Sequence, residues 1–250
     1  MTMLAPGPGA VPGPVWSRPP GGDVVEGLLE GIRIRAGAHN EPITVEFIPA
    51  PLRFIGKGTD AIVVAHPGLP ELAFKVYAPQ TVGCLADEYE AYQRLGASPW
   101  YAACLGRGAC YLVLSYEPGP TLYDCLVQGI PIPASAMADV EAARRYARSV
   151  GLHPKDVHLK NVLLQGERGR VLDVSKYVAP GDEDTVWDAL AEGYRRFYPL
   201  LRGRRIPVGL IELVKRHGKA RITARQRQVE KPPSTAITWP VTYAASGLHR

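Results

Sequence analysis

The segment GLHPKDVHLKNVLLQGERGRVLDVSKY, residues 151–177, decides the fold and the chemistry of this chain. It places Asp156 five positions before Asn161, and Asp173 lies in the apolar run RVLDV. The runs NVLLQ and RVLDV flank the turn GERG and therefore predict a β-hairpin. The three polar side chains have two interpretations. They form ordinary solvated turns and helix caps, or their hard oxygen atoms hold magnesium and a phosphate.

Along the chain, several strands and one helix come first, and mostly helix with a small hairpin follows a hinge. Alternating or apolar runs predict strands at residues 41–49, on both sides of the glycine turn in 52–66, and at 72–77 and 110–116, with a turn at 66–72. Helical spacing predicts helices over residues 83–96 and 135–153, and from about 185 to 197. This order predicts an α+β fold with two lobes, joined by the hinge EPGPT.

The two ends of the chain differ from this body in composition. The first twenty residues are rich in proline and glycine and almost uncharged, so we expect disorder over residues 1–40. Residues 202–250 contain 11 Lys/Arg against 2 Asp/Glu, a balance of +9, which leaves −4 for the rest of a chain of net charge +5. We expect this basic tail to be largely irregular, with one short helix over residues 209–216. It is either a surface for an anionic partner or a solvated extension.

The sequence gives no indication of export or membrane insertion. No basic start followed by an apolar stretch opens the chain, and no run of about 18 apolar residues occurs. The cysteines form no C-x-x-C pair, so we expect free thiols rather than disulfides or zinc ligands. We therefore expect a cytoplasmic protein without a membrane span.

Two features of the strand region suit a nucleotide site. Gly56 and Gly58 lie in a strand–turn–strand context, where missing side chains let backbone N–H groups approach phosphates. A plain hairpin turn is the alternative. Lys75 lies inside the apolar strand LAFKVY, so it is either buried beside a carboxylate or faces water at a sheet edge. Its expected partner is Glu88, beside the inward stripe of helix 83–96, and Glu90 is the competing choice.

With these motifs in this order, the chain resembles the protein-kinase-like superfamily, and above all its small atypical bacterial serine/threonine-kinase-like members. FIGKGTDAIVV is similar to the Gly-rich loop, LAFKVY to the V-A-I-K strand, DEYEAYQRL to the C helix and YLVLSYEPGPTL to the hinge. DVHLKNVLL is similar to the catalytic loop, and LDVSK stands in the place of D-F-G. The resemblance implies a kinase-like domain over residues 41–201, with an N-lobe at about 41–114 and a shortened C-lobe at about 118–201.

The resemblance also implies roles for the residues that match before the catalytic loop. The backbone around Gly56 and Gly58 would cover the phosphates of ATP. Lys75 would contact the α- and β-phosphates while paired with Glu88. The hinge would face adenine through a gatekeeper and the three residues after it, namely Leu114, Ser115, Tyr116 and Glu117.

In the catalytic loop, the resemblance makes Asp156 the residue that orients the acceptor hydroxyl and takes its proton, while Asn161 and Asp173 bind Mg²⁺. The loop departs from the family pattern, because the lysine usual two places after the aspartate is His158 here. His158 either donates a hydrogen bond to the transferred phosphate or packs structurally. Lys160 is a second candidate for the missing charge.

Together these features predict an ATP- and Mg²⁺-dependent phosphotransferase, in the first place a serine/threonine protein kinase. Only 28 positions separate Asp173 from Leu201, which is too short for the full peptide-binding lobe of a protein kinase. A kinase for a small-molecule hydroxyl is therefore the first alternative. A catalytically inactive kinase-like scaffold, which recruits partners through its basic tail, is the second.

Overall fold

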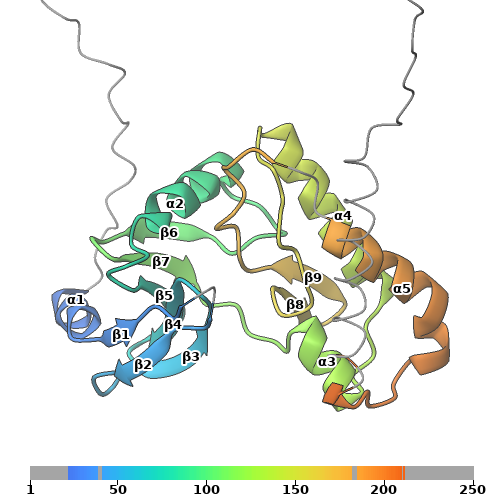
Figure 1. The fold of residues 1–250 in the computed structure, drawn as a ribbon, viewed down its shortest axis with the longest axis horizontal. Helices are drawn as coiled ribbons and strands as arrows, with labels where there is room; N and C mark the ends of the chain where they lie inside the picture. The colour runs from blue at the N-terminus through green and yellow to red at the C-terminus, as the bar shows by residue number, and fades with distance from the viewer. Residues whose placement is uncertain (1–21, 39–40, 182–184, 210, 212–250) are drawn as a thin grey trace, which may run out of the picture. The chain divides into compact units, whose positions relative to one another are not determined.

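The structure is a computed structural model that describes residues 22–38, 41–181, 185–209 and 211 (Figure 1). The chain divides into two compact units, Met1–Pro207 and Val208–Arg250, and every element below belongs to the first. The disorder expected for the first twenty residues and almost all of the expected helix at 209–216 lie outside the described residues, as does most of the basic tail.

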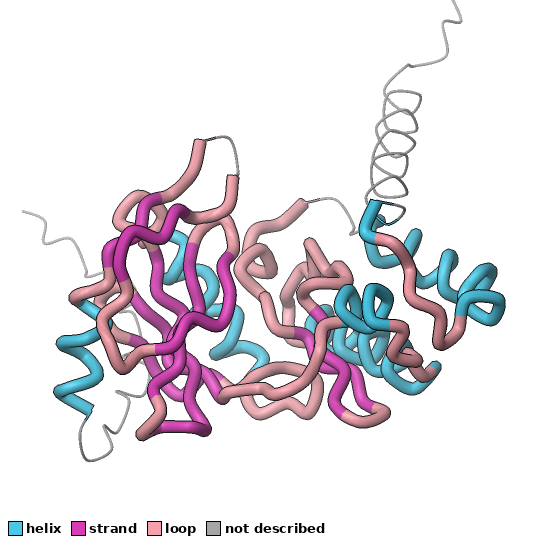
Figure 2. The backbone as a smooth tube through the Cα atoms, turned by 90° about the horizontal axis from the view of Figure 1, so that it is seen from below, coloured by secondary structure: helices cyan, strands magenta, loops and turns pink. Residues whose placement is uncertain are grey.

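Five antiparallel strands form the larger sheet, in the order β3–β4–β5–β7–β6. They run side by side in Figure 2. The central strand β5 pairs with β4 on one side and with β7 on the other, and it carries Lys75 opposite Val63 and Leu112. The strands are β3 (Arg53–Lys57), β4 (Ala61–His66), β5 (Leu69–Tyr77), β6 (Cys104–Arg107) and β7 (Tyr111–Ser115).

Strand β5 begins earlier than its sequence suggests. The turn expected over residues 66–72 is wrong beyond Gly68, because the strand already starts at Leu69 and includes Pro70. Pairing of β5 with β7 begins at Leu72, opposite Ser115, so Pro70 lies outside the part of β5 that pairs with β7. A residue without an N–H group is tolerated where one side of a strand is unpaired.

A helix and a small sheet precede the larger one, so the disorder expected up to residue 40 is wrong for residues 22–35. Helix α1 (Gly22–Glu30) leads into β1 (Arg33–Arg35), which pairs antiparallel with β2 (Thr44–Phe47). Val25 and Leu29 lie one helical turn apart and are buried against Ile62 and Phe74 of the larger sheet. This apolar stripe is sufficient to order the helix despite the proline-rich residues before it.

Helix α2 (Cys84–Leu95) confirms the helix expected over residues 83–96. It ends at Gly96, whose φ of 55° lies in the region that favours glycine. Its buried face combines one carboxylate with apolar side chains, namely Leu85, Glu88, Tyr89, Ala91, Tyr92 and Leu95. The helix therefore turns a single acid, Glu88, toward the interior.

In the described residues after β7, helices predominate over strands. Helices α4 (Ala134–Ser149) and α5 (Thr185–Leu201) match the two expected helices, and β8 (Val162–Gln165) with β9 (Arg168–Val171) forms the expected hairpin. Helix α3 (Leu122–Gln128) was not expected. Its signal is the T-x-x-D capping box of Thr121 and Asp124, which satisfies the first N–H groups of the helix. The α+β class predicted from the sequence is thereby confirmed.

Candidate functional site

A buried ion pair links the larger sheet to helix α2. Lys75 Nζ lies 2.7 Å from the carboxylate of Glu88, and the two side chains are 13% and 0% exposed. Tyr77, two residues after Lys75 and on the same face of β5, donates its hydroxyl to the same carboxylate. The competing acid, Glu90, instead pairs with Arg94 on the exposed side of the helix. The Lys75–Glu88 pair expected from the sequence is thus present.

Asp173, which follows strand β9 of the hairpin, also contacts Lys75 of this pair. Its Oδ1 lies 3.3 Å from Lys75 Nζ, although the two residues are 98 positions apart in the chain. The backbone N–H of Ser175 donates to the same oxygen at 3.0 Å. One ammonium therefore lies between two carboxylates, one from helix α2 and one from the loop after β9.

These contacts shift the pKa of each member of the cluster. Burial alone would lower the pKa of Lys75, but Asp173 and Glu88 raise it above its ordinary value. Burial opposes ionisation of Asp173, and Lys75 with the Ser175 N–H nevertheless lowers its pKa to about 2. Complete burial raises the pKa of Glu88, against the pull of Lys75. Lys75 and Asp173 are accordingly charged throughout the physiological pH range.

The loop before β8 holds Asp156 and Asn161 beside Asp173. The Asn161 amide nitrogen donates to the Asp156 backbone carbonyl at 3.2 Å, which leaves the amide oxygen as the atom able to face a cation. The carbonyl of Asn161 accepts the N–H of Leu172 at 2.9 Å, so Asn161 lies across the chain from the residue before Asp173. Asp156 itself has a φ of 59°, and it is the one non-glycine residue with positive φ in the described part of the chain.

The Asp156 carboxylate has two basic neighbours. Lys176 Nζ lies 2.6 Å from Asp156 Oδ2, and His158 Nε2 lies 3.8 Å from Asp156 Oδ1. Burial alone would lower the pKa of Lys176, but the hydrogen bond to Asp156 and the nearby carboxylate charges together raise it. Lys160 lies elsewhere, with its ammonium 4.6 Å from the centre of the Tyr123 ring.

The residues expected at the hinge lie at the end of β7. Leu114 is buried within the sheet, and Ser115 is the last residue of the strand. The Ser115 and Tyr116 N–H groups donate to the carbonyls of Ala103 and Glu71. The Glu117 carboxylate binds other parts of the chain, with Arg170 Nη1 at 2.5 Å, Ser115 Oγ at 2.6 Å and Gln165 Nε2 at 3.0 Å. Its side chain therefore anchors the hinge to the hairpin.

The glycine turn between β3 and β4 is a tight hairpin. The N–H of Gly58 donates to the carbonyl of Ala61 at 2.9 Å, and its own carbonyl accepts the N–H of Ile43. A Cβ added at Gly56 would meet nothing within 4 Å. The backbone at Gly56 is therefore open to an approaching group on the side where a Cβ would stand.

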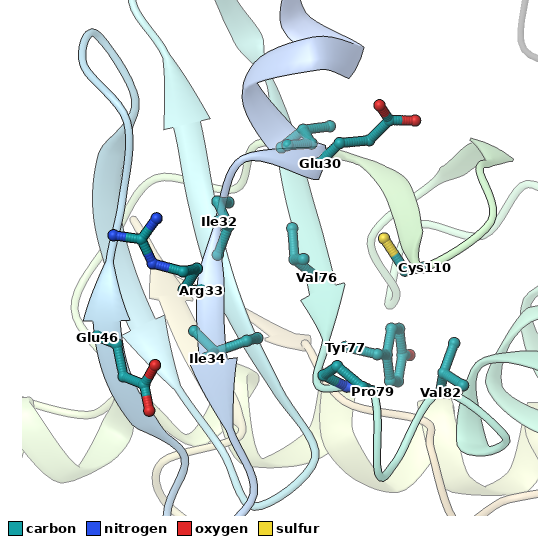
Figure 3. Close-up of a pocket in the computed structure, with 11 residues that line it drawn as sticks. Glu30, Ile32, Arg33, Ile34, Glu46, Val76, Tyr77, Pro79, Val82 and Cys110 are labelled. Carbon is teal, nitrogen blue, oxygen red and sulfur yellow. The ribbon is translucent and has the colours of Figure 1, made fainter.

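Figure 3 shows a cavity beside α1, β1 and the end of β5. It has a volume of about 500 Å³ and is lined mainly by apolar side chains of α1, β1 and the end of β5. Tyr77 is the member of the cluster that also lines it, while Lys75, Glu88 and Asp173 do not. The expected nucleotide site thus does not coincide with this cavity.

Asn161 and Asp173 carry oxygen atoms of the type that Mg²⁺ takes as ligands. Across the described residues, no group of three or more His, Cys, Asp or Glu side chains could hold a metal ion. Asn161 and Asp173 instead offer two hard oxygen ligands, a set that suits Mg²⁺ when phosphates and water complete its shell.

None of the helices in the described residues combines the length and the apolar character that a membrane span requires.

The α+β architecture and this lysine–carboxylate cluster are compatible with the kinase-like class of proteins. Comparison with known proteins supports that class. Over 150 residues, the chain is 35% identical to "Putative serine/threonine-protein kinase YrzF" of Bacillus subtilis (strain 168). The matched region covers 59% of this chain and 69% of that protein. The chain therefore belongs to the same kinase-like family. No family model matches it.

Two residues of the site were given no role from the sequence. Tyr77 had a signal, because residues two apart on a strand share a face and Lys75 was already expected to face a carboxylate. Lys176 lies in the motif LDVSK, but nothing in that stretch indicates that its side chain meets Asp156, which is 20 positions earlier.

Proposed function

We propose that this protein is an ATP- and Mg²⁺-dependent phosphotransferase that moves the γ-phosphate of ATP to a hydroxyl group. The observation that carries this proposal is the position of Lys75 between Glu88 and Asp173, at 2.7 and 3.3 Å. An ammonium is costly to bury unless it is paired. A lysine held in this way beside a carboxylate and an amide oxygen suits a triphosphate that carries a divalent cation.

Each residue of the site would have a separate role in the transfer. Lys75 binds phosphate oxygens, and Glu88 keeps its ammonium in place. Asn161 and Asp173 would hold Mg²⁺, which when bound neutralises charge on the phosphates. Asp156 orients the acceptor hydroxyl and accepts its proton as the new O–P bond forms and the bond from the γ-phosphorus to the β,γ-bridging oxygen breaks. The electrons of that bond leave with ADP.

A serine or threonine hydroxyl of a protein is the first candidate acceptor, in line with the printed name of the Bacillus subtilis relative. One observation favours a small-molecule acceptor instead. Helix α5 begins at Thr185, so only residues 174–184 lie between Asp173 and the next helix. A segment of this length offers little surface on which to bind an extended peptide.

We further propose that the kinase-like domain is larger than residues 41–201. Helix α1 and strand β1 precede this range, yet Val25, Leu29 and Ile34 pack in the same hydrophobic cluster as the larger sheet. The domain would then begin at about residue 22.

The test is phosphate transfer from labelled ATP, in the presence of Mg²⁺, to a peptide library and in parallel to a library of small hydroxyl metabolites. We expect Asp173→Ala to abolish Mg²⁺-dependent ATP binding, and Asp156→Ala to preserve binding while removing transfer. Equal binding and equal transfer in both variants would contradict these roles. If Mg²⁺ and ATP together fail to raise the melting temperature of the wild-type protein, the inactive-scaffold alternative is correct instead.

A further inference from the structure

We propose that Lys176 is a catalytic residue that binds the transferred phosphoryl group, in place of the lysine that the catalytic loop lacks at position 158. This inference rests on the proposed phosphotransferase function. It starts from a single contact, the 2.6 Å ion pair between Lys176 Nζ and Asp156 Oδ2. The pair joins the loop after β9 to the loop that carries the proposed base.

Among the described residues, the other basic side chains near Asp156 contact other groups or lie farther away. Lys155 donates to the carbonyl of Ala179 at 2.6 Å, and Lys160 lies over the ring of Tyr123. His158 lies 3.8 Å from Asp156, beyond hydrogen-bond distance. The ammonium of Lys176 is therefore the cation that the structure places on the carboxylate at which an acceptor hydroxyl would bind.

Stability does not explain this pair. The side chains of Lys176 and Asp156 are 57% and 42% exposed, and ion pairs this open to water contribute little to folding. The loop nevertheless holds Asp156 at a φ of 59°, a conformation that is uncommon for non-glycine residues, although aspartate adopts it more readily than most. Backbone strain of this kind concentrates at functional sites. The exposed ion pair and the positive φ of Asp156 are both expected of a loop with a catalytic role.

During transfer, the positive charge of Lys176 would stabilise the negative charge on the transferred phosphoryl group. Negative charge on the transferred group lies over its non-bridging oxygens, while the acceptor oxygen adds and the ADP oxygen departs. The proton of the acceptor goes to Asp156, so Lys176 keeps its own and acts only as a hydrogen-bond donor. Its flexible four-carbon side chain lets the ammonium reach from Asp156 to a phosphoryl oxygen beside it.

The experiment compares four forms of the protein: wild type, Lys176→Met, Lys176→Arg and the control Arg195→Met. The control removes an exposed cation of α5 that pairs with Glu192. For each protein, we would measure the Kd for ATP with Mg²⁺ by calorimetry. We would also measure kcat and KM for ATP turnover, with water as the acceptor where no other is known. Thermal unfolding reports whether each variant is folded, and Lys176→Gln replaces the Met variant if that one does not fold.

We expect Lys176→Met to lower kcat by about 10²–10³, the usual loss when one preorganised donor to a transition state is removed. Its Kd and KM should stay within about threefold of the wild type, Lys176→Arg should recover at least a tenth of kcat, and Arg195→Met should match the wild type. A Lys176→Met enzyme with unchanged kcat, with a change in KM alone, or with higher kcat would overturn the assignment. A wild-type protein that neither binds nor turns over ATP with Mg²⁺ would instead overturn the phosphotransferase function itself.

Discussion

Replacing Glu88 by alanine tests the centre of the site. Glu88 is completely buried and holds both Lys75 and the hydroxyl of Tyr77. Removing one partner of a buried ion pair costs about 3–5 kcal/mol, because the other charge is left uncompensated. Asp173 still lies 3.3 Å from Lys75, so we expect a loss near the lower end, about 3 kcal/mol of unfolding free energy.

The measurement is thermal and urea unfolding of the wild type, Glu88→Ala and Glu90→Ala. For a protein of this size, about 3 kcal/mol corresponds to a fall in Tm of about 6–12 °C. Glu90 lies on the same helix, and its pair with Arg94 is exposed, so its removal should cost less than about 1 kcal/mol. We also expect Glu88→Ala to weaken ATP binding, because Lys75 loses the partner that fixes its ammonium.

One outcome of these unfolding measurements would contradict the prediction for Glu88. If Glu88→Ala and Glu90→Ala unfold at the same temperature, the buried pair does not stabilise this fold, and Lys75 is not held as the structure indicates. Glu88→Gln separates charge from packing. It keeps an acceptor for Tyr77 and should lose only about 1–2 kcal/mol, since one hydrogen bond to a charged group is weakened.

Three further predictions concern other positions. Asp173→Asn should destabilise the protein near neutral pH. The difference from the wild type should close as the pH falls from about 4 to about 2, because a pKa lowered from 3.8 to about 2 contributes stability that is lost as the folded carboxylate is protonated. A difference that stays constant over this range in acid-dependent unfolding would contradict the Lys75 contact. Gly169→Ala should destabilise by about 1–3 kcal/mol, since its Cβ would stand 2.4 Å from the Ala136 carbonyl oxygen. Gly193→Ala, inside α5 with nothing within 4 Å, should stabilise by about 0.5–1 kcal/mol. Urea unfolding of both glycine variants checks this reversal of sign.

Local patterns in the sequence were enough to predict the elements that carry the site. The stripe of Leu85, Tyr89, Tyr92 and Leu95 predicted α2, and the position of Glu88 beside that stripe made it the preferred partner of Lys75. These predictions succeeded because helical and strand periodicity record which face of an element is buried. The resemblance to kinase-like proteins then related the pair to the catalytic loop.

The sequence failed where packing overrides local composition. The proline-rich start suggested disorder up to residue 40, yet two apolar residues one turn apart, Val25 and Leu29, find a partner surface on the larger sheet. Pro70 suggested a turn, but it lies in β5 before the first residue that pairs with β7, where a missing N–H group is tolerated. The contact of Lys176 with Asp156 depends on where two loops meet, which no local pattern records.

The two ion pairs of the candidate site suggest that both lysines change partners when ATP binds. In the protein alone, Lys75 contacts Asp173 and Lys176 contacts Asp156, so each carboxylate proposed to act on magnesium or on the acceptor hydroxyl has an ammonium as its partner. On the proposed function, Lys75 would turn to phosphate oxygens while Asp173 receives Mg²⁺, and Lys176 would turn to the transferred phosphoryl group while Asp156 accepts the hydrogen bond of the acceptor hydroxyl. Glu88 takes no part in this exchange, because it is fully buried and held by Tyr77. Its role is to keep Lys75 in place while the other partners change, which is why its removal should affect both folding and nucleotide binding.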